Sequence, residues 1–283
     1  MAHIAWAAGQ DFVATDSDLE LLTAAAVRAG HQAGTRIWDD PAVPWDDVDL
    51  VVVRSCWDYV PRREEFLAWA ESVPRLANPA PVLRWNTDKT YLRELEADGV
   101  AIVPTAWSVT SADELPPAGE WVVKPTVSAG SADTARWSDP EHAVAHSRDL
   151  LAAGRPTMTQ PYLASVDSHG ETGMLFFAGT YSHAFRKGAL LTTGDDPRSL
   201  PELEEDIGPR EPSDTERAFG QQVVEVISKR LGLTPLYARV DVVTDDDGSA
   251  RLMELELAEP SFFLEHTATG ADAFVAALER HLA

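Results

Sequence analysis

The chain has 283 residues, of which 45% are hydrophobic and 24% are charged, and its formal net charge at pH 7 is −23. That length allows two or three packed units, because domains usually run to about 100–200 residues. The strong negative charge repels nucleic acids and anionic membrane surfaces, so we expect neither as a partner. Any site for an anionic nucleotide must therefore reverse this field locally with Lys, Arg or a divalent cation.

Export and membrane signals are not apparent in the sequence. The N-terminus lacks the basic and apolar regions of a signal peptide. No stretch approaches the roughly 18 consecutive apolar residues of a membrane span. Cys56 is the only cysteine, which excludes an intrachain disulfide, and we interpret it as a small packing residue. We therefore expect a cytoplasmic protein.

The first part of the chain alternates between strand and helix patterns. Residues 3–8 read as a short strand and residues 18–30 as a helix. Residues 49–53 form a nearly continuous apolar run, which is typical of a parallel strand buried on both faces. Residues 62–73 carry apolar positions at helical spacing. This alternation predicts an α/β, doubly wound N-terminal domain over residues 1–84.

Substrate contacts are expected where the strand at 49–53 ends, because ligands of such sheets bind off the carboxyl ends of the strands. The loop that follows provides Arg54, Trp57, Asp58 and Tyr59 as candidate substrate residues. Asp58, Glu256 or Glu259 could hold an amino group of the substrate. Arg54 could hold a carboxylate. The alternative role of Trp57 and Tyr59 is to fill the interface between two domains.

Two further α+β units are expected, over 85–160 and 161–283. In the first, Asn86 and Thr87 begin a helix that runs to about residue 98, with Lys89 in its first turn. The second is expected to contain the following segments: strands around 172–186, an irregular connection at 192–213, a helix at 214–231, a hairpin at 236–257 and a closing helix at 271–282.

The segment 236–257 predicts a hairpin with one acidic face. Asp247-Gly248 between alternating apolar residues is a strong signal for a two-residue turn, in which residue 246 faces 249. The paired positions are then Val240 with Leu255 and Val242 with Met253 on the apolar face, and Asp241 with Glu254 and Arg239 with Glu256 on the other.

Carboxylates that oppose one another across a ladder destabilise it, and a hard divalent cation removes that cost. Asp241, Glu254 and Glu256 are therefore candidate ligands of Mg²⁺, with Mn²⁺ as a substitute. A solvated outer face with an Arg239–Glu256 ion pair is the alternative. The run from Asp245 to Asp247 is interpreted as turn chemistry.

Two lysines stand where an anion could bind. Lys89 lies at the expected helix start, whose free amides attract phosphate. Lys124 ends a buried strand and precedes a loop of small residues that includes Ser128 and Gly130, which could fold over a phosphate. Neither a P-loop nor a GxGxxG motif occurs. Exposed or structural lysines are the alternative in each case.

The next segment offers contacts for a base and for an anion. Gln160, Tyr162 and Leu163 belong to an extended connection whose backbone could recognise an adenine edge. Glu171 begins the following strand, and we expect it to contact the nucleotide. Arg186 ends the strand after it and could neutralise a phosphate or a carboxylate. A surface ion pair is the alternative for each.

In this order the segments resemble the ATP-grasp ligases over nearly the whole chain. In that family two lysines contact the nucleotide phosphates, a linker backbone recognises adenine, and an Asp and a Glu-x-Asn hold two Mg²⁺ ions. Asp241 and Glu254 match the first two ligands, whereas Glu256 occupies the usual Asn position, which leaves its role open. The resemblance rests on WNTDKTYL around Lys89, WVVKP around Lys124, TQPYL around Gln160, RVD ending at Asp241 and MELELAEP with Glu254 and Glu256.

The N-terminal segments RSCWDY, RREEFLAWA and NPAPVLRWNTDK are similar to the subgroup that contains the O-ureido-serine cyclo-ligase of cycloserine biosynthesis. The resemblance implies that ATP activates a carboxylate as an acyl phosphate, which an amine then attacks. It also implies that Lys89, Lys124 and Arg186 stabilise the developing charge. The substrate would be small and amino-acid-like.

Several questions stay open at this point. Ring closure within one molecule, ligation of two molecules and a catalytically idle nucleotide-binding module all fit the motifs. Ligases of this type are often homodimers, and no interface stripe marks one here.

Overall fold

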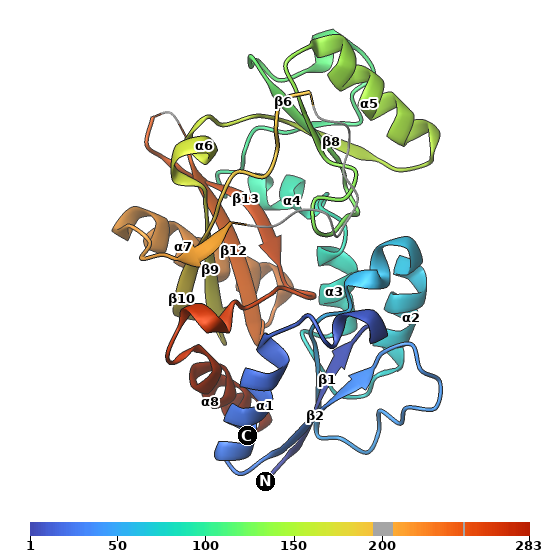
Figure 1. Cartoon of the computed structure of the whole chain (residues 1–283), viewed down its shortest axis with the longest axis vertical. Helices are drawn as coiled ribbons and strands as arrows, with labels where there is room; N and C mark the ends of the chain where they lie inside the picture. The colour runs from blue at the N-terminus through green and yellow to red at the C-terminus, as the bar shows by residue number, and fades with distance from the viewer. Residues whose placement is uncertain (195–205, 246) are drawn as a thin grey trace.

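The computed structural model describes residues 1–194, 206–245 and 247–283. Three β-sheets follow one another along the long axis of the molecule, and each has helices packed against it (Figure 1). This arrangement confirms the predicted α/β class. Within the described residues, no helix has the length and apolar character needed to cross a membrane.

The N-terminal sheet is parallel and has the order β2-β1-β3-β4. Successive residues of β1 face opposite sides, so Ile4 and Trp6 pack toward α1 and α8, whereas Ala5 and Ala7 pack toward α2. The two faces are covered as the doubly wound prediction requires, and each predicted strand or helix ends within two residues of its expected bound, whereas β2 and β4 were not predicted. The elements are β1 His3–Ala8, η1 Gln10–Phe12, α1 Asp18–Arg28, β2 Gln32–Ile37, β3 Leu50–Val53, η2 Trp57–Arg62, α2 Arg63–Ser72, β4 Leu76–Ala77 and α8 Gly270–Leu282.

The central sheet is antiparallel, with the order β11-β10-β9-β12-β13. Helix α7 packs on one face of it and has the predicted bounds, because Ser213 and Glu216 form a capping box at its start and Gly232 ends it in the left-handed region. The elements are β9 Glu171–Phe177, β10 Thr180–Lys187, β11 Ile207–Pro209, α7 Asp214–Leu231, β12 Tyr237–Thr244, β13 Ala250–Glu256 and η4 Leu264–His266.

The register of the β12–β13 hairpin is confirmed in one half and wrong in the other. Arg239 faces Glu256, Val240 faces Leu255 and Asp241 faces Glu254, as predicted. A bulge then shifts the ladder, so that Val242 faces Leu252 and not Met253. The amide of Asp245 donates to the carbonyl of Ser249 at 2.8 Å, so residue 245 takes the position expected for Asp246, which lies outside the described residues.

The third sheet has the order β5-β8-β6-β7, and α5 covers one of its faces. Its strands and helix lie at the far end of the molecule from the N-terminal sheet (Figure 1). The elements of this part are α3 Ala80–Asn86, α4 Tyr91–Ala97, β5 Ala106–Trp107, η3 Ala112–Glu114, β6 Trp121–Pro125, β7 Ala135–Trp137, α5 Pro140–Ala152, β8 Thr157–Pro161 and α6 Ser165–His169.

The single helix expected from Asn86 to about residue 98 is wrong. Helix α3 ends at Asn86, α4 begins at Tyr91, and Lys89 lies in the connection between them. The carboxylate of Asp88 accepts a hydrogen bond from the amide of Thr90 at 3.0 Å, a local turn that competes with continuous helix. Lys89 therefore reaches its surroundings from a loop.

The connection expected at 192–213 contains a strand. Residues Ile207–Pro209 form β11, which pairs with the end of β10. The prediction that this whole connection is irregular is thus wrong for β11, and residues 195–205 of it lie outside the described residues.

Asn78 joins the N-terminal sheet to the central sheet. Its side chain is 1% exposed, and its φ of 54° lies in the left-handed region that Asn tolerates. Its amide donates to the carbonyls of Tyr237 and Leu257 at 2.8 and 2.9 Å, and its oxygen accepts from the amide of Leu236 at 2.8 Å. One side chain thus satisfies three buried backbone groups.

We expect Asn78→Ala to lower the free energy of unfolding by about 2–4 kcal/mol, because it leaves those buried backbone groups without partners. Urea titration followed by circular dichroism measures this change. Gln221→Ala, which removes an exposed amide on α7, is the control and should change stability by less than about 0.5 kcal/mol. Equal stability of the two variants would contradict the role of Asn78.

Candidate active site

A cavity of about 310 Å³ lies where the three sheets meet. Its walls come from η2, the α3–α4 connection, β6 and the loop after it, β8, β9, β10, β12, β13 and the segment after β13. The cavity is lined by most of the candidate residues that were chosen from the sequence. They are Trp57, Tyr59, Lys89, Lys124, Ser128, Gly130, Gln160, Tyr162, Leu163, Glu171, Asp241, Glu254, Glu256 and Glu259.

Arg54 and Asp58 are placed elsewhere, in packing roles. Arg54 is buried, where it pairs with Asp18 at 2.9 Å, donates to the carbonyl of Pro260 at 2.9 Å and stacks on Phe262. Asp18 also accepts hydrogen bonds from the amides of Phe262 and Leu264. The expected substrate contact of Arg54 is therefore replaced by a contact that fixes the segment after β13.

Asp58 lies beside its own helix and not on the cavity. It accepts from the indole nitrogen of Trp38 at 3.0 Å and pairs with Arg62, four residues later. The sequence could not separate this local ion pair from a substrate contact.

Arg186 also does not line the cavity, although its neighbours Phe185 and Lys187 do. Side chains alternate along a strand, so the position between two inward residues points away. Arg186 instead pairs with Asp206. The basic residue that β10 presents to the cavity is Lys187, which the sequence analysis did not select, although the alternation could have identified it.

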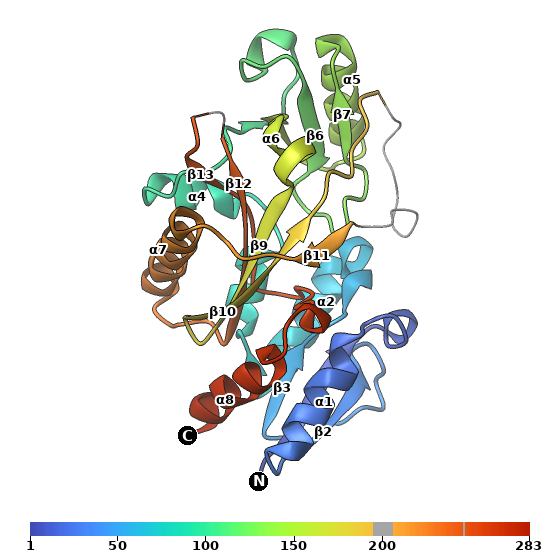
Figure 2. The same cartoon turned by 60° about the vertical axis from the view of Figure 1, so that its left-hand side comes forward.

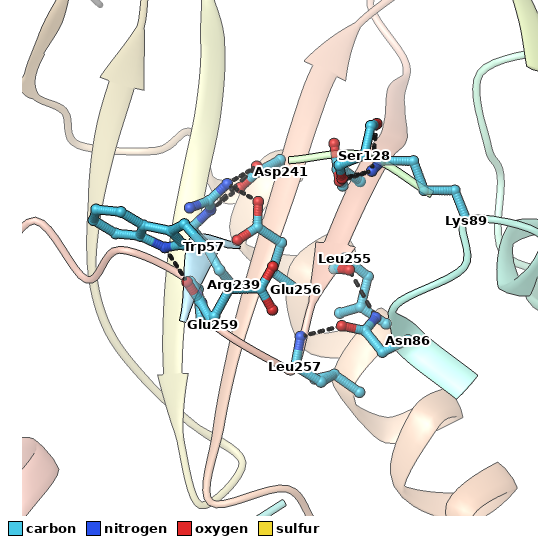
Figure 3. A network of polar contacts seen from close by, with 12 residues as sticks. Trp57, Asn86, Lys89, Ser128, Arg239, Asp241, Leu255, Glu256, Leu257 and Glu259 are labelled. Atoms are coloured by element: carbon cyan, nitrogen blue, oxygen red, sulfur yellow. Dashed lines mark hydrogen bonds and ion pairs between the residues drawn. The ribbon is translucent and has the colours of Figure 1, made fainter. Parts of the chain in front are cut away.

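Lys89 is held between the central sheet and the loop after β6. Its ammonium lies 3.1 Å from a carboxylate oxygen of Glu254 and donates to the carbonyl and hydroxyl of Ser128 at 2.7 and 3.2 Å (Figure 3). The carboxamide of Asn86 binds the carbonyl of Leu255 and the amide of Leu257, so it fixes the start of this connection to the free edge of β13.

Arg239 neutralises the acidic face of the hairpin from within the same sheet. Its guanidinium makes hydrogen bonds of 2.7–3.1 Å with Asp241 and a close ion pair with Glu256 (Figure 3). The predicted Arg239–Glu256 ion pair thus exists, but it faces the cavity and not solvent. The buried guanidinium satisfies two carboxylates that would otherwise repel one another.

The two glutamates of β13 have different proton affinities. Burial would raise the pKa of Glu254, but Lys89 and Lys124 outweigh it and lower that pKa to about 2. Burial raises the pKa of Glu256 to about 8, because Glu254 and Asp241 add repulsion that Arg239 only partly offsets. Glu254 therefore keeps its negative charge to a lower pH than Glu256 does.

Lys124, Glu171 and Lys187 add further charges to the cavity lining. Burial lowers the pKa of Lys124, and Lys89 nearby lowers it further, while Glu254 opposes both. Burial also raises the pKa of Glu171, which faces Lys187 across the β9–β10 ladder. These lysines give the cavity positive charge in a chain that is strongly negative overall.

The donor set suits a hard divalent cation bound together with phosphate. In the described ranges 1–194, 206–245 and 247–283, no group of three or more His, Cys, Asp or Glu side chains could hold a metal ion. Asp241 and Glu254 do present carboxylate oxygens to the cavity from facing positions of one ladder. Mg²⁺ takes only one or two carboxylates and fills its shell with water and phosphate, so these residues fit it.

The β8 side of the cavity is ordered around Gln160. Its side-chain amide donates to the hydroxyl of Thr105 at 3.0 Å, and the residue is 2% exposed. Tyr162 and Leu163 follow it along the cavity wall. Residues 159–161 of the predicted extended connection belong to strand β8, and Tyr162 and Leu163 continue from its end.

The opposite end of the cavity is aromatic and contains one carboxylate. Phe12, Trp57 and Phe263 line it. The indole nitrogen of Trp57 donates to the carbonyl of Glu259 at 3.1 Å (Figure 3). Burial raises the pKa of the half-buried Glu259 to about 7, although Lys89 and Tyr59 oppose that shift.

Glu259 should therefore make stability depend on pH. Its pKa rises from 4.5 to about 7 on folding, so its stabilising contribution is complete below pH 4.5 and is lost as pH rises through 7. The upper bound on this contribution to the free energy of unfolding is about 3 kcal/mol at ~1.4 kcal/mol per pKa unit, and solvent screening reduces it.

Urea unfolding at pH 5 and pH 8 measures this effect. The difference in unfolding free energy between the two pH values should be smaller for Glu259→Gln than for the unsubstituted protein. Glu96→Gln, which changes an exposed residue of α4, is the control and should keep the full difference in unfolding free energy between pH 5 and pH 8. If Glu259→Gln also kept the full difference, the raised pKa of Glu259 would be disproved.

Comparisons with known proteins agree with this geometry. Residues 4–78 match the family described as D-cycloserine synthetase DcsG, N-terminal domain. The chain is 39% identical to the cycloserine biosynthesis protein DcsG of Streptomyces lavendulae over 284 residues, which covers 94% of each chain.

Two solved structures extend the match to the whole fold. The crystal structure of D-cycloserine synthetase DcsG has a TM-score of 0.90 and 35% identity, covering 99% of this chain and 100% of that chain. The ATP-grasp ligase PsnB, complexed with minimal precursor, has a TM-score of 0.62 and 19% identity, with 97% and 98% covered, and therefore shows the fold alone. The chain belongs to the family of the D-cycloserine synthetase DcsG and shares its fold with an ATP-grasp ligase.

Proposed function

We propose that this ligase closes a ring within a small amino-acid-like substrate such as O-ureidoserine, at the expense of ATP. The observation that carries the proposal is a single cavity with lysines and opposed carboxylates at one end and an aromatic wall with Glu259 at the other. The 39% identity to a cycloserine biosynthesis protein supports the same class of product.

The reaction is expected to proceed in two steps. An oxygen of the substrate carboxylate attacks the γ-phosphorus of ATP, ADP leaves, and an acyl phosphate forms. An amine of the same molecule then attacks the acyl carbon, inorganic phosphate leaves, and the amine proton passes to a base or to water. No protein nucleophile is needed, which agrees with the burial of Cys56.

The nucleotide would lie between the Gln160–Leu163 wall and the loop that carries Ser128 and Gly130. Lys89 and Lys124 would contact the phosphates, since both are buried lysines on the cavity lining. Asp241 and Glu254 would hold Mg²⁺, which would supply positive charge to stabilise the negative charge of the phosphates. Glu171 would contact the sugar or phosphates, and Glu256 would stay with Arg239.

The reacting carboxylate would lie near Arg239, which is fixed by Asp241 and Glu256 and can stabilise negative charge at the acyl group. Glu259 and Tyr59 would contact the substrate amine from the aromatic end. Trp57 and Phe12 would limit the size of the substrate, because their rings contact one another edge to face at that end. Positioning of this kind favours attack within one molecule.

The direct test is Mg²⁺-dependent release of ADP and phosphate across a panel of amino acids that includes O-ureidoserine, with mass spectrometry of the products. Ring closure predicts a product from one substrate molecule that is lighter by at least one water. A condensed pair of molecules would instead establish an intermolecular ligase and contradict the proposal.

Glu254→Gln provides the control for the chemistry. It retains the shape of the side chain but removes the charge that faces Lys89, so ADP formation should be lost while the protein stays folded. Glu96→Gln should retain full activity. Full turnover in Glu254→Gln would rule out its proposed role, and no turnover in the unsubstituted protein on any substrate would point to an idle nucleotide-binding module.

A further inference from the structure

The chain that leaves β10 crosses from the central sheet to the edge of the third sheet. Gly188 is fixed at the start of this stretch, where its amide donates to the carbonyl of Asp206 at 2.8 Å. Leu190 and Leu191 then line the cavity. Figure 2 shows this part of the chain running up toward β7 before the grey trace begins. We call residues 188–194 the crossing segment.

The crossing segment ends by pairing with β7. Thr193 forms a parallel bridge with Arg136, and the amide of Gly194 donates to the carbonyl of Arg136 at 2.9 Å. The hydroxyl of Thr193 donates to Glu120 at 2.6 Å. The crossing segment is therefore attached at both ends and covers part of the cavity between them.

Arg136 is the residue on which these contacts converge. Its guanidinium binds Glu120 at 3.1 Å through Nε, lies 3.4 Å from Asp167 and donates to the carbonyl of Leu191 at 3.5 Å. Its side chain is 13% exposed. It thus joins β7, α6 and the crossing segment.

The same guanidinium also supports the cavity wall. Its carbon lies 3.4 Å from the centre of the Tyr162 ring, and the Tyr162 hydroxyl donates to Asp167. Arg136, Val122 and Gln160 occupy facing positions in three adjacent strands, so Arg136 continues the row of side chains that forms this wall. Arg136 itself is not among the cavity-lining residues, so it acts through Tyr162 and the crossing segment.

We propose that Arg136 is a positioning residue for the ligase reaction: it holds the crossing segment across the cavity and fixes the Tyr162 ring against the bound nucleotide. Water is thereby excluded from the acyl phosphate. This inference rests on the proposed function. Only arginine suits the position, because its planar fork bonds several acceptors while its face stacks on an aromatic ring, and an ammonium cannot do both.

Arg136→Lys tests the inference with the charge retained. We expect the KM for ATP to rise about tenfold, and ADP release to exceed product formation because water reaches the intermediate. Arg148→Lys, at an exposed position of α5, is the matched control and should keep both values. A folded Arg136→Lys protein with unchanged KM and equal amounts of ADP and product would overturn the proposal.

A second readout does not depend on turnover. Hydrogen exchange of the amides in residues 188–194 should be faster in Arg136→Lys and in Thr193→Val than in the unsubstituted protein, with a non-hydrolysable ATP analogue bound. Unchanged exchange in both variants would contradict the positioning role. Absence of ADP formation in the unsubstituted protein would instead refute the proposed function, so the two failures are distinguishable.

Discussion

The charge balance on the inner face of β12 and β13 is the constraint on which the site depends. Asp241, Glu254 and Glu256 face the cavity, and buried carboxylates are stable only with partners. Arg239 pairs with Asp241 on its own strand and with Glu256 on β13. Lys89 comes from the α3–α4 connection and pairs with Glu254. The acidic face that could hold a cation therefore also determines where Lys89 must lie.

Side-chain contacts to backbone groups bring the N-terminal sheet, the α3–α4 connection and the central sheet together around that face. Asn78 links β4 to the starts and ends of the hairpin strands, and Asn86 with Tyr91 binds the free edge of β13. Asp18 fixes the segment that carries Glu259. Each contact satisfies buried backbone groups that lie outside a sheet ladder, so the cavity walls are placed by polar contacts and not by apolar packing alone.

Much of the site could be predicted because alternation in strands is a local property. The pairing of Asp241 with Glu254 follows from a turn signal and counting. The bulge that places Met253 on the cavity could not be predicted, because an extra residue leaves no mark on the apolar pattern. Arg186 was chosen over Lys187 because both residues are basic, although alternation places Lys187 on the same strand face as the apolar Phe185. The tertiary roles of Asn78 and Arg54 depend on segments far away in the chain.

A cavity that presents Asp241 and Glu254 to the phosphates should accept a nucleotide only together with a divalent cation. Isothermal titration of the unsubstituted protein with a non-hydrolysable ATP analogue, in Mg²⁺ and then in EDTA, tests it most directly. The account predicts clear binding with Mg²⁺ and affinity at least about tenfold weaker without it, because phosphate then meets uncompensated carboxylates. Equal affinity in both conditions would contradict the assignment of Asp241 and Glu254.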